Sequence, residues 1–60
     1  MKQNELVRLM KAAGCTLVKH GARHDMWYSP ITKNKTFVPR HSSQEIAKGT
    51  ALQIRKVLGI

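Results

Sequence analysis

The apolar positions in the first quarter of the chain recur with the spacing of an amphipathic helix. They are Leu6, Leu9, Met10 and Ala13. This spacing predicts a helix over residues 4–13, with one apolar stripe facing the rest of the protein. Asn4 is a candidate N-cap because its side-chain oxygen can accept a hydrogen bond from a free backbone N–H. Gly14 is expected to end the helix, since glycine adopts the left-handed conformation at little cost.

Three short runs in the middle of the chain, each bounded by turn residues, predict β-strands. They cover residues 15–20, 23–29 and 36–38. Gly21 and Ala22 form the predicted tight turn between the first two strands. Residues 32–35 have the composition of a polar hairpin turn, in which Asn34 is expected to take a positive φ. Because the links between the strands are short, we expect an antiparallel meander.

A second apolar stripe lies near the end of the chain. It comprises Ala51, Ile54 and Leu58. Its spacing predicts a helix over residues 47–58. Gly59 is expected to take the left-handed conformation after this helix, and Ile60 to fold back onto it. Ser42 and Glu45 have the spacing of a capping box, which would cap either an isolated turn or this helix.

The resulting order of helix, three strands and helix indicates an α+β fold with a three-stranded antiparallel sheet. Two amphipathic helices and one small sheet bury each other's apolar surface only when both helices cover the same face of the sheet. The other face is then open to solvent, and we expect the function to lie on it or at its rim. We interpret the chain of 60 residues as one domain, because a chain of this length supports only one small core.

The charge of the chain favours an anionic partner. Eleven Lys and Arg residues against three Asp and Glu residues give a formal charge of +8 at pH 7. Nucleic acid is the leading partner class, an acidic protein the second and an anionic membrane the third. No basic amphipathic helix with a continuous apolar face stands out, which weakens the membrane interpretation. The start of the chain has no apolar signal segment, so we expect a cytoplasmic protein.

Cysteine usage and histidine spacing limit the chemistry further. Cys15 is the only cysteine, which excludes a disulfide within the chain. One cysteine and three scattered histidines do not have the spacing of zinc ligands, so we expect neither a metal nor a cofactor. Cys15 is interpreted as a small buried hydrophobic residue.

Residues 20–30 concentrate the side chains that could carry chemistry. The run holds two of the three histidines, the only Trp and the only Tyr. If Trp27 packs under the helices, strand alternation places His24 and Tyr28 on the open face. The residue types alone leave His24 open between a catalytic and a structural role. They also leave Trp27 open between the core and a platform for base stacking.

An exposed histidine in a basic protein suits the cleavage of RNA. The 2′-hydroxyl of the substrate is the nucleophile, so the protein only has to move protons and neutralise the phosphorane. Histidine can transfer either proton, and arginine or lysine can stabilise the developing charge. Asp25 is not expected to assist His24, because adjacent strand residues face opposite ways. We interpret Asp25 as a solvated or salt-bridged group.

Several short motifs occur in a fixed order along the chain. They are His-Gly-Ala-Arg-His-Asp-Met-Trp-Tyr-Ser-Pro at residues 20–30, Val-Pro-Arg-His at 38–41, Glu-Ile at 45–46 and the pattern Gly-Thr…Ile…Leu-Gly-Ile at 49–60. The first predicted helix, which begins Asn-Glu-Leu and ends Ala-Gly, fits the same series. In order and spacing the chain resembles the HicA family of bacterial toxins over nearly its whole length.

This resemblance implies a toxin of a type II toxin–antitoxin pair, with an α-β-β-β-α fold like that of a double-stranded-RNA-binding domain. HicA toxins are metal-independent mRNA endonucleases that depend on one histidine at the start of the second strand, and His24 matches it. Their partner is a HicB antitoxin, which covers this histidine. Many members carry a small residue before the histidine, where this chain has Arg23.

We therefore interpret the chain as a ribonuclease toxin in which His24 is the general acid or base. The residues expected to contact RNA are Arg23, Tyr28, Lys33, Lys35, Arg40 and His41. The second proton-transfer group stays open among Tyr28, His41 and a water molecule. Two alternatives remain: a non-catalytic RNA-binding module of the same fold, and an interaction domain whose basic face docks on an acidic protein.

Overall fold

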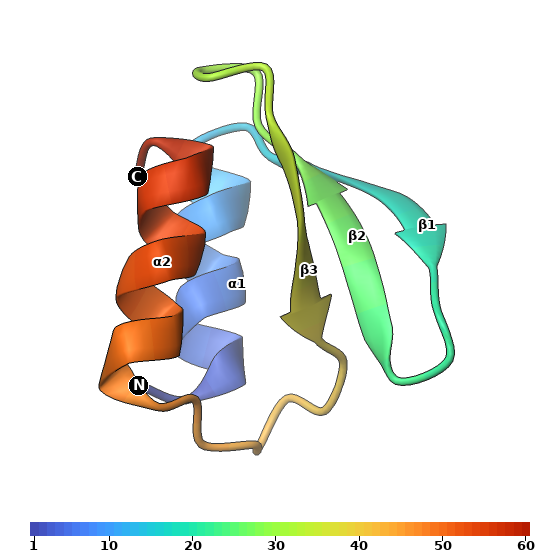
Figure 1. The fold of residues 1–60 in the computed structure, drawn as a ribbon, viewed down its shortest axis with the longest axis vertical. Coiled ribbons are helices and arrows are strands. Elements are labelled where there is room, and N and C mark those ends of the chain that lie inside the picture. Colours follow the sequence, from blue (N-terminus) through green and yellow to red (C-terminus); the bar gives the residue numbers. More distant parts are fainter.

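The computed structural model covers residues 1–60 (Figure 1). Along the chain, one helix precedes the three strands of the sheet and a second helix follows them. The elements are α1 (Gln3–Ala12), β1 (Thr16–His20), β2 (His24–Tyr28), β3 (Lys35–Pro39) and α2 (Lys48–Leu58). The sheet is antiparallel in the order β1-β2-β3, so consecutive strands are neighbours. Figure 1 shows β3 at the edge nearest α2 and β1 at the opposite edge. The predicted α-β-β-β-α order and meander are confirmed.

Both helices pack against the same face of the sheet and share one core with it. The core consists of Leu6, Met10, Cys15, Trp27, Val38, Ile46, Ala51, Ile54 and Leu58. The predicted stripe of α2 is therefore buried as a whole, and the prediction for Cys15 is also confirmed. Trp27, which the sequence left open between the core and a base-stacking platform, lies in the core. Along β2, Asp25 and Trp27 are buried while the residues between and beside them are more exposed, as strand alternation requires.

The predicted stripe of α1 is only half right. Leu6 and Met10 are buried, but Leu9 is 41% exposed. The third buried position on this helix is Gln3, which lies one turn before Leu6. The side of α1 that the sheet and α2 cover therefore carries Gln3, Leu6 and Met10, and Leu9 faces solvent. The Gln3 side chain donates a hydrogen bond of 2.8 Å to the Pro39 carbonyl, which ties α1 to the end of β3.

The prediction that Asn4 caps α1 is wrong. The helix begins at Gln3, and no side chain caps it. Instead, the Gln3 N–H donates to the Gln44 carbonyl (2.9 Å) and the Asn4 N–H donates to the Ser42 carbonyl (3.0 Å). These backbone carbonyls satisfy donors that a side-chain cap would otherwise serve. A distant segment therefore replaces the local cap.

The same segment explains why the capping box is also wrong. No side chain caps α2, which begins at Lys48. The Glu45 carboxylate instead pairs with the Met1 amino group, whose nitrogen lies 2.5 Å away. The hydrogen bond with the amino group lowers the pKa of Glu45, and its effect is larger than that of burial, which raises the pKa. Residues 42–45 thus hold the start of the chain and not the start of α2.

The end of α2 has the predicted form and is tied to the β2–β3 connection. Gly59 has a φ of +73°, and Ile60 packs against the core. The buried Ser29 hydroxyl donates to the Leu58 carbonyl over 2.6 Å, and the Thr32 hydroxyl donates to the Val57 carbonyl over 2.7 Å. These two bonds satisfy carbonyls at the end of the helix that have no partner within it.

In the β2–β3 connection the positive φ falls on Lys33 (φ +60°) and not on Asn34 as predicted. The Ser29 N–H donates to the Asn34 carbonyl (2.9 Å), and the Lys33 N–H donates to the Ser29 carbonyl (2.8 Å). Ser29 and Asn34 therefore close the loop as a pair, which makes Lys33 its last residue. The left-handed residue is the one that leads the chain back into the strand.

A β-bulge interrupts the pairing of β1 with β2 between Leu17 and Lys19. Because of this bulge, Leu17 lies opposite Trp27 while Lys19 lies opposite Met26 on the other face. All five residues of β1 are exposed. β1 is therefore an open edge of the sheet, and Lys19 joins the face on which His24 lies.

Candidate functional site

His24 is the first residue of β2 and stands directly after the loop residues Ala22 and Arg23. Its side chain is exposed on the face opposite Trp27, as predicted. The Gly21 N–H donates to the His24 carbonyl over 2.8 Å, which closes the turn. A Cβ at Gly21 would lie 2.6 Å from that carbonyl oxygen. Only glycine fits this approach, so Gly21 sets the backbone position from which the imidazole projects.

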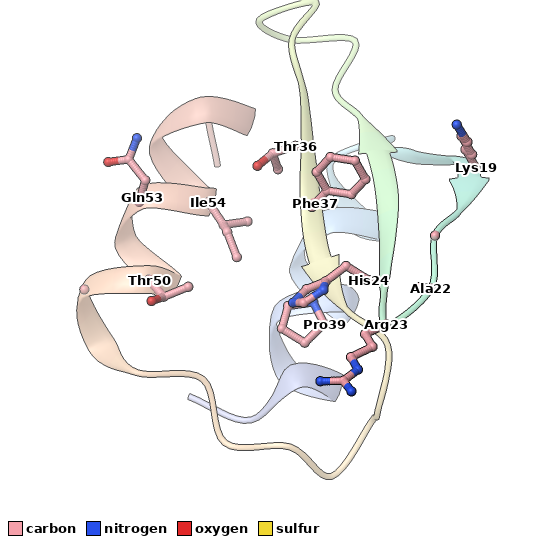
Figure 2. Close-up of a pocket in the computed structure, with 12 residues that line it drawn as sticks. Lys19, Ala22, Arg23, His24, Thr36, Phe37, Pro39, Thr50, Gln53 and Ile54 are labelled. Atoms are coloured by element: carbon pink, nitrogen blue, oxygen red, sulfur yellow. The ribbon is translucent and has the colours of Figure 1, made fainter.

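The imidazole lines a hollow of about 930 Å³ along the edge strand β3, which reaches from the open face of the sheet to α2 (Figure 2). Its walls are formed by the β1–β2 connection with Lys19 of β1 and His24 of β2, by β3, and by the first half of α2. Figure 2 shows His24 and Phe37 on the sheet side and Thr50 and Gln53 on the α2 side. A cavity of this size lies in the range of small-ligand sites. We call it the β3–α2 hollow.

The charged residues of the β3–α2 hollow are all cationic. Lys19 and Arg23 line it, and no Asp or Glu does. Figure 2 shows Arg23 next to His24, at the end of the hollow formed by the β1–β2 turn. With a formal charge of +8 on the whole chain, this arrangement attracts an anion to the imidazole.

A half-buried ion-pair network lies on the other face of the sheet, behind His24. The Asp25 carboxylate accepts hydrogen bonds from the Arg40 guanidinium (3.0 Å) and from Nδ1 of His20 (2.9 Å). The bond to His20 and, after it, the contacts with Arg40 lower the pKa of Asp25, while burial opposes this effect. The Arg40 guanidinium also donates to the Gly21 carbonyl. The salt-bridge interpretation of Asp25 is confirmed, and the network holds both sides of the turn that carries His24.

Three of the predicted RNA-contact residues lie far from His24. Tyr28 pairs with Lys35 at one end of the β2–β3 ladder, whereas His24 pairs with Pro39 at the other end. Four residues along a strand correspond to about 13 Å. Tyr28, one of the open candidates for the second proton-transfer group, therefore does not lie beside the imidazole, because residues on one face of a strand still separate along its length. Lys33, in the loop beyond Tyr28, is farther away again.

Arg40 and His41 follow β3 and do not line the β3–α2 hollow. The guanidinium of Arg40 is held by Asp25 and the Gly21 carbonyl. His41 is exposed in the connection between β3 and α2. Of the predicted site residues, the structure thus brings only Arg23 to His24.

Phe37 and the polar side of α2 were not expected at the site. Phe37 is 53% exposed on the open face, opposite Met26, while its neighbour Val38 is fully buried. Strand alternation allows only one of two adjacent residues to face the core, and this signal could have identified Phe37. Thr50 and Gln53 gave no such signal, because their place in the hollow depends on how α2 packs against β3.

The structure contains no group of three or more His, Cys, Asp and Glu side chains that could hold a metal ion. Neither helix has the length and apolar character needed to cross a membrane.

Comparison with known families gives one match. A family model described as "HicA toxin of bacterial toxin-antitoxin" matches residues 4–60. No curated protein and no solved structure gives a significant match. The matched segment contains every residue that lines the β3–α2 hollow, from Lys19 to Ile54.

Proposed function

Since the chain belongs to the HicA family of toxins from bacterial toxin–antitoxin pairs, we propose that it is a metal-independent endoribonuclease that cleaves mRNA. One observation supports the proposal above the others. The exposed His24 imidazole lies in an open hollow beside Arg23, and no carboxylate lines that hollow. An RNA strand can therefore approach the imidazole without electrostatic repulsion.

His24 supplies the proton transfer in this proposal. The 2′-oxygen of the substrate attacks the adjacent phosphorus atom and loses its proton, while the bond from phosphorus to the 5′-oxygen breaks. The imidazole either removes the first proton or protonates the departing 5′-oxygen. The products are a 2′,3′-cyclic phosphate and a 5′-hydroxyl group. The second proton-transfer group is a water molecule in our proposal, because Tyr28 and His41 lie outside the hollow.

Arg23 and Lys19 stabilise the charge that develops on the phosphorane. Both line the hollow, and Arg23 directly precedes His24 in the chain. Cationic groups already in place stabilise a transition state because they need no reorganisation during the reaction. Lys33 and Lys35 bind phosphates farther along the strand, and this contribution weakens as salt is added.

The same exposure makes His24 accessible to a protein partner. We propose that a HicB-type antitoxin neutralises the toxin by covering the β3–α2 hollow. The charge of +8 favours an acidic surface on the antitoxin, since opposite charges accelerate encounter and disfavour wrong partners.

A cleavage assay tests the proposed activity. Purified protein is incubated with single-stranded RNA in the presence of EDTA, and the fragments and their end groups are analysed. We expect fragments with cyclic phosphate and 5′-hydroxyl ends from the natural chain, and none from His24→Gln with an unchanged circular dichroism spectrum. Full cleavage by His24→Gln removes His24 from the mechanism. RNA binding without any fragments identifies a non-catalytic RNA-binding module instead.

A further inference from the structure

We propose that Phe37 is a stacking platform for one base of single-stranded RNA, which occupies the β3–α2 hollow next to His24. The inference rests on the proposed function, because it assigns the RNA form that the same site accepts. Phe37 is 53% exposed although it belongs to the central part of a strand in a small protein. Phe37 lies opposite Met26 on the open face of the sheet and does not belong to the buried core.

The position of the ring relative to His24 fits one nucleotide. His24 pairs with Pro39 and Met26 pairs with Phe37, so His24 and Phe37 are diagonal neighbours on one face. Such neighbours have Cα atoms about 7–8 Å apart, within reach of aromatic side chains. A base lying on Phe37 therefore has its own phosphate close to the imidazole. Figure 2 shows both rings on the sheet side of the hollow.

The surroundings of the ring leave space for a base. A Cβ at Gly21 would stand 4.0 Å from Cε1 of Phe37, so the ring borders the β1–β2 turn at a residue that has no side chain. On the α2 side, the hollow is bordered by Thr50 and Gln53, which are polar and exposed. A base between these walls finds an aromatic face on one side and groups that form hydrogen bonds on the other.

Single-stranded RNA suits this geometry better than a duplex. A base within a duplex is stacked on both sides and has no free face, whereas an unpaired base can stack on an aromatic side chain. Loss of such a stacking contact costs about 1–3 kcal/mol, which corresponds to a roughly 5- to 150-fold weaker affinity. The cations Lys19 and Arg23 at the same hollow complement the strand's phosphates.

The test uses a short RNA that carries 2′-O-methyl groups, so that binding is measured without cleavage. The variants are Phe37→Leu, which keeps an apolar side chain but removes the aromatic face, and Phe37→Trp, which keeps it. The control is Leu52→Ala, because Leu52 is also 53% exposed but does not line the hollow. A second RNA, in which the bases are replaced by abasic sites, measures the contribution of stacking.

We expect Phe37→Leu to bind the RNA 5- to 150-fold more weakly, in the range quoted for stacking, and both Phe37→Trp and Leu52→Ala to bind it as the natural chain does. The abasic RNA should bind the natural chain more weakly, by a similar factor, and should not distinguish it from Phe37→Leu. Equal affinities of Phe37→Leu and the natural chain for the RNA overturn the assignment of Phe37 as a stacking platform. The ring is then expected to contact a protein partner. In that case cleavage by the natural chain still supports the nuclease proposal. If the natural chain binds no RNA, both proposals fail.

Discussion

The Arg40 guanidinium donates a hydrogen bond of 3.0 Å to the carboxylate of Asp25, on the face of the sheet opposite the His24 imidazole. Asp25 is adjacent to His24 in the chain, and Arg40 also donates to the carbonyl of Gly21. The pair therefore fixes the backbone on both sides of the turn from which His24 projects. The pair thus connects the end of β3 to the turn that carries His24, although neither side chain lines the β3–α2 hollow.

Arg40→Ala is expected to reduce the rate of RNA cleavage more than it reduces RNA affinity. The reason is that Arg40 positions the turn that carries His24, whereas a phosphate contact would act on binding. The measurement is kcat together with the Kd for uncleavable RNA at several salt concentrations. A phosphate contact would instead lower the slope of log K against log salt by about 1, with kcat preserved.

The stability of the protein is expected to fall in acid because of Asp25. Its pKa in the folded protein is lowered by His20 and Arg40, so the unfolded chain takes up the proton first. The stabilisation is complete above the usual aspartate pKa of about 3.9 and is lost as the pH falls through the lowered value. Urea midpoints between pH 7 and pH 2 measure this effect.

Asp25→Asn is the matched variant for the acid experiment. It removes the titrating group, so its urea midpoint should depend less on pH than that of the natural chain. Glu45, whose pKa is also lowered, remains in both proteins and supplies the residual dependence. Identical pH profiles would show that Asp25 does not contribute.

Gly21→Ala is expected to destabilise the protein by about 1–3 kcal/mol and to abolish most of the cleavage. The new Cβ would lie 2.6 Å from the His24 carbonyl oxygen, so the backbone that carries the imidazole has to move. The matched control is Gly49→Ala in α2, where a Cβ meets nothing within 4 Å. Gly49→Ala should raise the free energy of unfolding by up to about 1 kcal/mol, because alanine favours the helix more than glycine does. Chemical denaturation of both variants checks the sign of each effect.

Ser29→Ala is expected to cost about 1–3 kcal/mol of unfolding free energy. Ser29 is fully buried, and its hydroxyl donates to the Leu58 carbonyl over 2.6 Å. The variant leaves this carbonyl at the end of α2 without a donor. Urea unfolding measures the loss, and the affinity for RNA should stay unchanged because Ser29 does not line the hollow. A loss below about 0.5 kcal/mol, which is the lower end of the net contribution of one hydrogen bond to stability, would show that this bond is not important.

Arg23→Gln and Lys35→Gln should differ although each removes one positive charge. Arg23 lines the β3–α2 hollow beside His24, so its loss is expected to lower the cleavage rate on the order of 100-fold. Lys35 lies at the opposite end of the β2–β3 ladder, so its loss should weaken RNA binding but leave the rate at saturating RNA unchanged. Single-turnover cleavage at saturation separates the two. Equal rates would remove Arg23 from the transition state.

Patterns within short stretches of the chain predicted most of the fold. The spacing of Ala51, Ile54 and Leu58 identified the buried face of α2, and alternation placed Trp27 and His24 on opposite faces of the sheet. Gly59 ended α2 as expected. These features depend on the periods of helix and strand and on the backbone preference of one residue, all of which are local properties.

Features that join distant segments could not be predicted in this way. The donors at the start of α1 are satisfied by backbone carbonyls of residues 42 and 44, so neither the Asn4 cap nor the capping box is needed. Arg40 binds Asp25 because the start of β2 lies beside the end of β3. Backbone carbonyls leave no trace in a pattern of side chains, and a charged residue does not indicate which distant partner it will meet.

The site shows the same division. His24 and Arg23 are neighbours in the chain, so the order of residues was enough to place an imidazole next to a cation at the start of a strand. The hollow itself exists because α2 packs along the edge of β3, which brings Thr50 and Gln53 into the same hollow as Phe37. Local sequence thus determined which group carries the proposed chemistry. The packing of a helix against a strand edge, which depends on the whole core, determined what surrounds that group.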